Sequence, residues 1–233
     1  MIHKRRGRFF LVAGTLLIAA AMGIVGYNLW ENRQAGIARD RVVEQLSKEL
    51  PLLSGQPSPA QSEKRDDGKE SNIYLPFPGG SDSVANVQEI VYPDYVLNPN
   101  MEMPTKTIDG HEYIGVLFVE AEDLYIPIMS DFDYKHLKIN PCRYAGSLYQ
   151  DNLVLAAHNY ATHFGWLYTA AVGDELTFTD MDGNVFRYRI ADIEQMRPTE
   201  AKRMVESEWA LTCFTCSIGN QTRLAVRCER MDG

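Results

Sequence analysis

Three side chains suited to acid–base or nucleophilic chemistry stand at the ends of apolar segments. Cys216 closes the segment WALTCFTC, before a loop that contains Gly219 and Asn220. His158 follows the apolar run NLVLAA, and Arg223 opens the run RLAV seven residues after Cys216. A thiol, an imidazole and a guanidinium can act as nucleophile, general acid–base and oxyanion donor. Each residue alone also fits a structural role. Their placement on strands therefore decides between a catalytic and a structural interpretation.

Side-chain alternation along a strand separates the cysteines by role. If residues 209–215 form a strand, Cys213 and Cys216 point to opposite faces, which argues against a redox pair or a zinc site. Cys213 and Cys228 then fit small buried apolar side chains. Cys142, between Pro141 and Arg143, gives no indication of its role.

The two arginines of the last apolar segment differ in position. A six-residue return loop places Arg223 close to Cys216. Arg227 lies on the same face roughly 13 Å further along, where we expect a surface ion pair. His163, five residues after His158, is interpreted as a structural or substrate-side residue.

Short strands are expected to position these residues. The turn pair Asp182-Gly183 between two apolar runs predicts a hairpin. Short helices are predicted at 162–168 and 199–206. Seven strands in about 120 residues indicate a sandwich or a barrel; they are predicted at 113–119, 124–129, 152–157, 175–179, 185–190, 209–215 and 223–229.

The N-terminal part reads as a membrane anchor. Residues 9–30 carry no charge and are long enough for a helix to span a bilayer. Four basic residues precede them, which predicts a cytoplasmic tail at 1–8 and an extracellular remainder. A cleaved signal peptide ending near Ala19-Ala20-Ala21 is the competing interpretation; it exports the domain equally.

Composition divides the remaining chain. Spacing of apolar residues predicts a stalk helix over 31–53, and a polar Pro/Ser-rich stretch predicts a flexible linker over 54–72. Residues 73–110 are expected to lie extended on a catalytic domain spanning 111–233. That domain carries eleven basic and eighteen acidic residues within a chain of net charge −8, which argues against nucleic-acid binding.

Three segments together resemble the sortases, membrane-anchored cysteine transpeptidases of Gram-positive bacteria. Thr212 to Cys216 (TCFTC) is similar to the family's TLxTC, Leu155 to Asn159 (LAAHN) to its histidine motif, and Arg223 to Val226 (RLAV) to its arginine strand. The departures are Ala157 for Gly and Cys213 for Leu. A papain-like protease is excluded by order, because that family places Cys before His.

The resemblance implies an all-β fold, a closed eight-stranded sortase-type β-barrel with short helices after an N-terminal transmembrane helix. The eighth strand is expected near 134–147 or 190–198. The lack of a second membrane helix and of an Asp-Pro-aromatic lid motif favours a protein-anchoring, class B-like or clostridial-type member.

The resemblance also implies a reaction. Cys216 cleaves an LPxTG-like sorting signal of a secreted protein through a thioester, with His158 as acid–base and Arg223 as donor. Thr215 and Asn159 are expected at the substrate, Thr215 either bonding it or shaping the pocket. The acceptor is an amine of the cell wall or another protein, and neither cofactor nor metal is required.

Two further hypotheses concern the function of Cys216 and of a segment ahead of the barrel. A membrane-tethered binding or adhesion module without catalysis would leave Cys216 as a buried strand cysteine. Independently, Leu75 to Gly79 (LPFPG) resembles the LPxTG pattern with Pro78 in place of Thr. We therefore hypothesise that it can cover the groove as a pseudosubstrate lid, against an ordinary extended connector.

Overall fold

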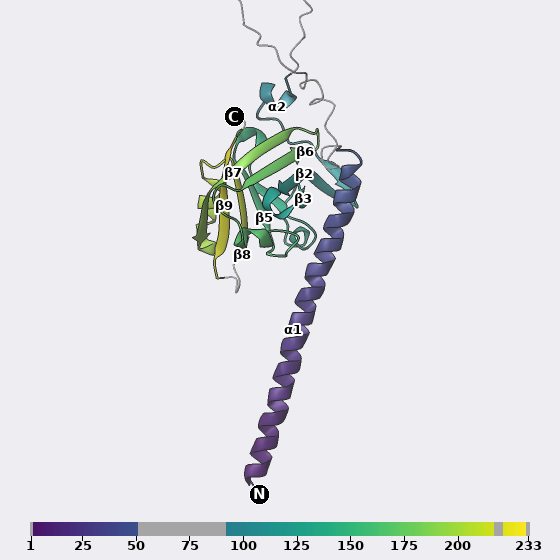
Figure 1. Cartoon of the computed structure of the whole chain (residues 1–233), viewed down its shortest axis with the longest axis vertical. Helices are drawn as coiled ribbons and strands as arrows, with labels where there is room; N and C mark the ends of the chain where they lie inside the picture. Colours follow the sequence, from purple (N-terminus) through teal and green to yellow (C-terminus); the bar gives the residue numbers. More distant parts are fainter. Residues whose placement is uncertain (1, 51–91, 217–220, 232–233) are drawn as a thin grey trace, which may run out of the picture.

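The structure is a computed structural model that describes residues 2–50, 92–216 and 221–231. The predicted linker at 54–72 and the LPFPG segment lie outside these residues. A long helix, α1 (Ile2–Ser47), runs past a β-barrel and extends well beyond it toward the N-terminus (Figure 1). It covers both the predicted anchor and most of the predicted stalk without a break.

The apolar part of α1 is long and hydrophobic enough to cross a membrane, and none of that stretch is buried against the barrel. Leu16 and Leu17, for example, are 65% and 72% exposed. The C-terminal part is different, because Val42 and Leu46 are buried. One helix therefore has a lipid-compatible half and a half that packs on protein.

Strands pair around a closed ring, in the order β2-β3-β4-β5-β8-β9-β7-β6, and β2 pairs with β6 to complete it. This is the expected closed eight-stranded barrel, with the three-residue β1 added beside β2. The bounds are β1 (Lys106–Ile108), β2 (His111–Val119), β3 (Leu124–Met129), β4 (Cys142–Ala145), β5 (Leu153–Ala157), β6 (Glu175–Asp180), β7 (Val185–Met196), β8 (Leu211–Cys216) and β9 (Arg223–Arg230).

The strand missing from the seven predicted ones is β4, inside the expected window 134–147. The other window, 190–198, largely belongs to β7, which is twice as long as the predicted strand 185–190. The hairpin at Asp182-Gly183 is confirmed, and Gly183 has a left-handed φ of 83°. Asp180 accepts bonds from the backbone amides of Asp182 and Asn184 and so fixes this turn.

Closure depends on one glycine. Gly115 lies on β2 where that strand pairs with both β3 and β6. A Cβ there would be 2.3 Å from both the Phe178 ring and the Thr179 carbonyl oxygen, so no other residue fits without moving the backbone.

Short helical segments connect the strands. They are α2 (Asp94–Leu97), α3 (Ala201–Val205) and the 3₁₀ turns η2 (Glu120–Glu122), η3 (His136–Lys138), η4 (Leu148–Gln150), η5 (Gly165–Tyr168) and η6 (Pro198–Glu200). The helices predicted at 162–168 and 199–206 correspond to η5 and to η6 with α3. Ahead of the barrel, Tyr95 of α2 stacks on Tyr149 at 4.8 Å, and Met103 is buried.

Within the described part of the chain, the two largest of three apolar clusters hold the barrel and α1 together. The larger fills the barrel and includes Leu117, Phe178 and Val226. The second lies outside the barrel wall, where Val42 and Leu46 of α1 pack on side chains of β2, β3 and β4. The barrel therefore buries part of its outer surface under the stalk half of α1.

Candidate active site

Three neighbouring strands bring His158, Cys216 and Arg223 together. β5 and β8 run parallel with Ala157 opposite Thr215, so the next residues, His158 and Cys216, leave the sheet side by side. β8 and β9 run antiparallel with Cys216 directly opposite Arg223. The register thus places all three residues at one end of the barrel, as neighbours on adjacent strands about 4.8 Å apart.

The faces of β8 follow the predicted alternation. Cys213 is fully buried in the barrel interior with Cys228, and burial raises the pKa of both thiols. Phe214 and Cys216 are half-buried on the outer face and line one pocket. All four cysteines are free. Cys216 is the only one of them that is not buried, and a thiol must be reachable to act as a nucleophile.

The pocket on this outer face has a volume of about 190 Å³ and is lined by His158, Cys216 and Arg223 together. Its walls are largely apolar and aromatic. One wall comes from the segment before β4, and the other from the segment between β7 and β8. The main wall residues are Phe132, Tyr134, Tyr144, Pro198, Met204 and Phe214. Such a cleft suits an apolar segment of an extended peptide next to a polar reacting end.

His158 is half-buried at the edge of the pocket. Burial lowers the pKa of its imidazole, the negative charge of Glu31 opposes that shift, and the positive charge of Lys138 adds to it. At neutral pH the ring is therefore mainly neutral, which is the form that can accept a proton.

Thr215 and Asn159 are not placed alike. Thr215 is 1% exposed, and its hydroxyl donates to the Ala157 carbonyl oxygen at 2.8 Å, which ties the ends of β5 and β8 together. This favours pocket shaping over direct contact with substrate. Asn159 is exposed and lines a second, more open hollow that also includes Asn32 and Tyr168.

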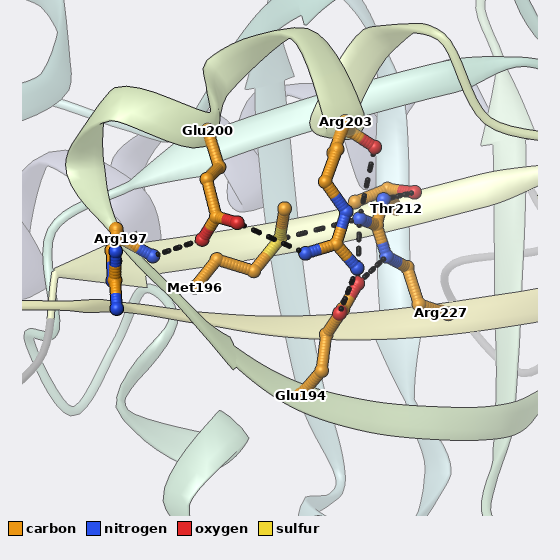
Figure 2. A network of polar contacts seen from close by, with 7 residues as sticks. All are labelled: Glu194, Met196, Arg197, Glu200, Arg203, Thr212 and Arg227. Carbon is orange, nitrogen blue, oxygen red and sulfur yellow. Dashed lines mark hydrogen bonds and ion pairs between the residues drawn. The ribbon is translucent and has the colours of Figure 1, made fainter.

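Arg227 differs from the expectation of a surface ion pair, because its side chain is only 2% exposed. It donates to Glu194 Oε1 through Nε (2.9 Å) and Nη2 (2.8 Å), and through Nη1 to the Thr212 hydroxyl at 2.9 Å. Nη2 also reaches the Arg203 carbonyl oxygen at 3.1 Å (Figure 2). The segment between β7 and β8 covers the outer face of β9 here. Arg227 is therefore buried, although the strand pattern predicts an exposed position.

The network in Figure 2 extends into that roof. Arg203 pairs with Glu194 and Glu200, and Glu200 accepts a bond from the backbone amide of Arg197. Arg197, Pro198 and Met204 line the pocket from this segment. Arg227 consequently anchors one wall of the pocket and does not reach the thiol.

Two further contacts were not predicted from the sequence. Tyr168 of η5 donates its hydroxyl to the Cys216 carbonyl oxygen at 2.9 Å, which fixes the end of β8. His163 is fully buried, and its Nε2 lies 3.2 Å from the Ile139 carbonyl oxygen, so it has a structural position. Among the residues that the structure describes, no three His, Cys, Asp or Glu side chains are grouped to hold a metal ion.

Comparisons with known proteins bear on the family to which the domain is related. Residues 117–231 match the family model of the sortase domain, which confirms the resemblance to the sortase family that the three motifs predicted. Sortases are cysteine transpeptidases, and the match spans all three pocket residues. No curated protein matches the chain.

Several solved structures are similar. Sortase C1 of Streptococcus agalactiae in complex with MTSET is 23% identical, with a TM-score of 0.45 over 52% of this chain and 68% of that one. Sortase C of Streptococcus pneumoniae is 22% identical, with a TM-score of 0.46 over 52% and 70%. Sortase C-1 of Actinomyces oris is 22% identical, with a TM-score of 0.45 over 51% and 73%. The class within the family stays a prediction.

Proposed function

We propose that the chain is a membrane-anchored transpeptidase in which Cys216 is the nucleophile, His158 the general acid–base and Arg223 the oxyanion donor. The observation that carries this proposal is the meeting of the three side chains in one pocket, from the ends of three adjacent strands. A buried strand cysteine would need none of this arrangement.

The reaction has two halves. His158 takes the thiol proton as Cys216 Sγ attacks the carbonyl carbon of the scissile peptide bond, and it delivers that proton to the departing amine as the C–N bond breaks. A thioester between enzyme and substrate remains. In the second half His158 takes a proton from an incoming amine, which attacks the thioester, and it returns a proton to the Cys216 sulfur as the C–S bond breaks.

Arg223 is suited to the charge that develops in both halves. Arg223 lies directly opposite Cys216 in the β8–β9 register and lines the same pocket. A cationic N–H donor next to the forming oxyanion stabilises the transition state more than the ground state.

The substrate that fits this site is an LPxTG-like sorting signal of a secreted protein. The aromatic walls of the pocket are complementary to its Leu-Pro part, while the scissile bond lies at the thiol. The acceptor is an amine of a cell-wall precursor or of another protein. The four basic residues ahead of the anchor at 9–30 favour a cytoplasmic N-terminus and a catalytic domain outside the cell.

The test is turnover of a pentapeptide library with an amine acceptor by the full-length chain in nanodiscs. We expect one LPxTG-like motif to be cleaved and joined to the amine, and Cys216→Ala to abolish both steps. Cys213→Ala, the matched control on the opposite face of β8, keeps the activity. Peptide binding without turnover would instead favour a tethered binding module.

A further inference from the structure

The stalk part of α1 contacts the chain segment that follows His158. Tyr160 donates its hydroxyl to Glu31 Oε2 at 3.2 Å, and the backbone amide of Ala161 donates to Asn32 Oδ1 at 3.2 Å. These residues are 129 positions apart in the chain. The helix directly after the anchor is therefore bonded to the segment that carries the candidate acid–base.

Glu31 is held in place from several sides. Its Oε1 accepts a bond from Lys138 Nζ at 2.9 Å and another from the Tyr27 hydroxyl at 2.8 Å. The ion pair with Lys138, followed by the bond from Tyr27, lowers the pKa of the carboxyl. Glu31 is thus an ionised carboxylate in a fixed position at neutral pH.

Tyr160 links this carboxylate to the imidazole. Its ring lies 5.0 Å from the His158 ring, centroid to centroid, at an interplanar angle of 34°. The carbonyl oxygen of Tyr160 accepts bonds from the backbone amides of His163 and Gly165, which fixes the backbone at the other end of the side chain. Because Tyr160 is fixed both at its backbone and at its hydroxyl, its ring restricts the His158 ring that packs on it.

We propose that Glu31 is a positioning residue for His158, acting through the Tyr160 ring and through its own negative charge. This inference rests on the proposed function. The sequence offers no carboxylate near His158, and the long helix supplies one from a distant part of the chain. A negative charge nearby favours the imidazolium that forms each time His158 accepts a proton.

Other titratable groups lie around this ring. Lys138 of η3 is the second charge that acts on its pKa, while Cys216 of β8, Arg223 of β9 and Arg197 of the segment after β7 line the same pocket. His163 belongs to the same segment as His158. Only Glu31 and Lys138 need be varied, because they act on the pKa of His158 in opposite directions.

The kinetic experiment uses the full-length chain in nanodiscs with Glu31→Gln, Tyr160→Phe and the double variant. We expect kcat to fall roughly 5- to 20-fold in each, with KM nearly unchanged, because the acid–base is misplaced while the binding walls are intact. The double variant should lose no more than Glu31→Gln alone, since the path through the Tyr160 ring starts at the Glu31 carboxylate.

The matched control is Glu44→Gln, which breaks an ion pair with Lys48 on the same helix and should leave kcat unchanged. A fully additive double variant, or an equal loss in Glu44→Gln, would overturn the inference.

The second experiment follows the His158 ring by NMR of ¹³C-histidine-labelled protein. We expect Glu31→Gln to lower the pKa of His158 and Lys138→Gln to raise it. Shifts in the same direction, or no shift in either, would contradict the coupling. This measurement does not depend on catalysis, whereas full activity of His158→Ala would refute the proposed function instead.

Discussion

At the scale of single residues, two arginines on one strand have separate roles. Arg223 lines the pocket opposite Cys216, whereas Arg227 is buried in a network with Glu194 and Thr212. β9 places both arginines on its outer face. The segments that cover this face then determine how far each side chain is buried. We therefore propose that Arg223 serves the chemistry and Arg227 the stability of the fold.

Substitution should separate these roles. Arg223→Ala removes a charged donor and should lower kcat by roughly 10²–10³-fold with little change in melting temperature; Arg223→Lys should also be poor, since Lys lacks the planar fork. Arg227→Ala leaves Glu194 without its main partner and should cost about 3–5 kcal/mol of unfolding free energy. Peptide turnover and denaturant titration check the pair, and near wild-type turnover by Arg223→Ala would contradict its assignment.

His163 makes the fold sensitive to acid. Burial lowers the pKa of its imidazole to about 3, against an ordinary value of 6.5. Below pH 6.5 the unfolded chain therefore binds a proton that the folded chain cannot, and the free energy of unfolding falls as pH falls toward 3.

From pH 7 to pH 5 this one group accounts for a loss of about 2 kcal/mol. His163→Gln should be less stable at pH 7 but should lose about that much less on acidification. Urea unfolding followed by near-UV circular dichroism measures the difference. His136→Gln, on a partly exposed turn, is the control; identical pH dependence of wild type and His163→Gln would refute the argument.

At the scale of elements, α1 is part of the folded domain and not only a tether. Leu46 is fully buried among Val116, Met129 and Cys142 of the barrel wall. Removing its side chain opens a cavity between helix and barrel, so Leu46→Ala should cost about 2–4 kcal/mol. Denaturant unfolding of the full-length chain checks this. Ile37→Ala, at a 45% exposed position of the same helix, should cost far less; equal losses would argue against docking.

How far the sequence predicts the fold depends on the range of each contact. The seven predicted strands are present because each carries its own apolar pattern, and the six-residue loop correctly placed Arg223 opposite Cys216. β4 has only four residues and an interrupted register, so its pattern is too short to identify. The burial of Arg227 and the contact of Glu31 with Tyr160 depend on segments distant in sequence, which no local pattern encodes.

At the scale of the whole molecule, α1 fixes which end of the barrel faces the anchor. Residues 31 and 32 contact the segment after His158, whereas Glu49 forms an ion pair with Lys106 of β1 at the other end of the contact. Sixteen residues of helix, about 24 Å, separate Glu31 from Ser47, and Glu49 follows two residues after the helix ends. The active-site end thus lies toward the apolar part of α1 (Figure 1).

If residues 9–30 span the bilayer, the site is held at the membrane surface, where a sorting signal still attached to the membrane would arrive. We test this with a fluorophore at Ala161→Cys or Lys48→Cys in a Cys216→Ala background, in nanodiscs carrying a headgroup quencher. Ala161 bonds to Asn32 just beyond the anchor, while Lys48 directly follows the end of α1 at Ser47, which is fifteen helical residues or about 23 Å from Asn32. We expect strong quenching at 161 and weak quenching at 48, because a nitroxide on the lipid headgroup quenches a fluorophore only at short range. Equal quenching at both sites would contradict an orientation in which the active-site end of the barrel faces the membrane surface.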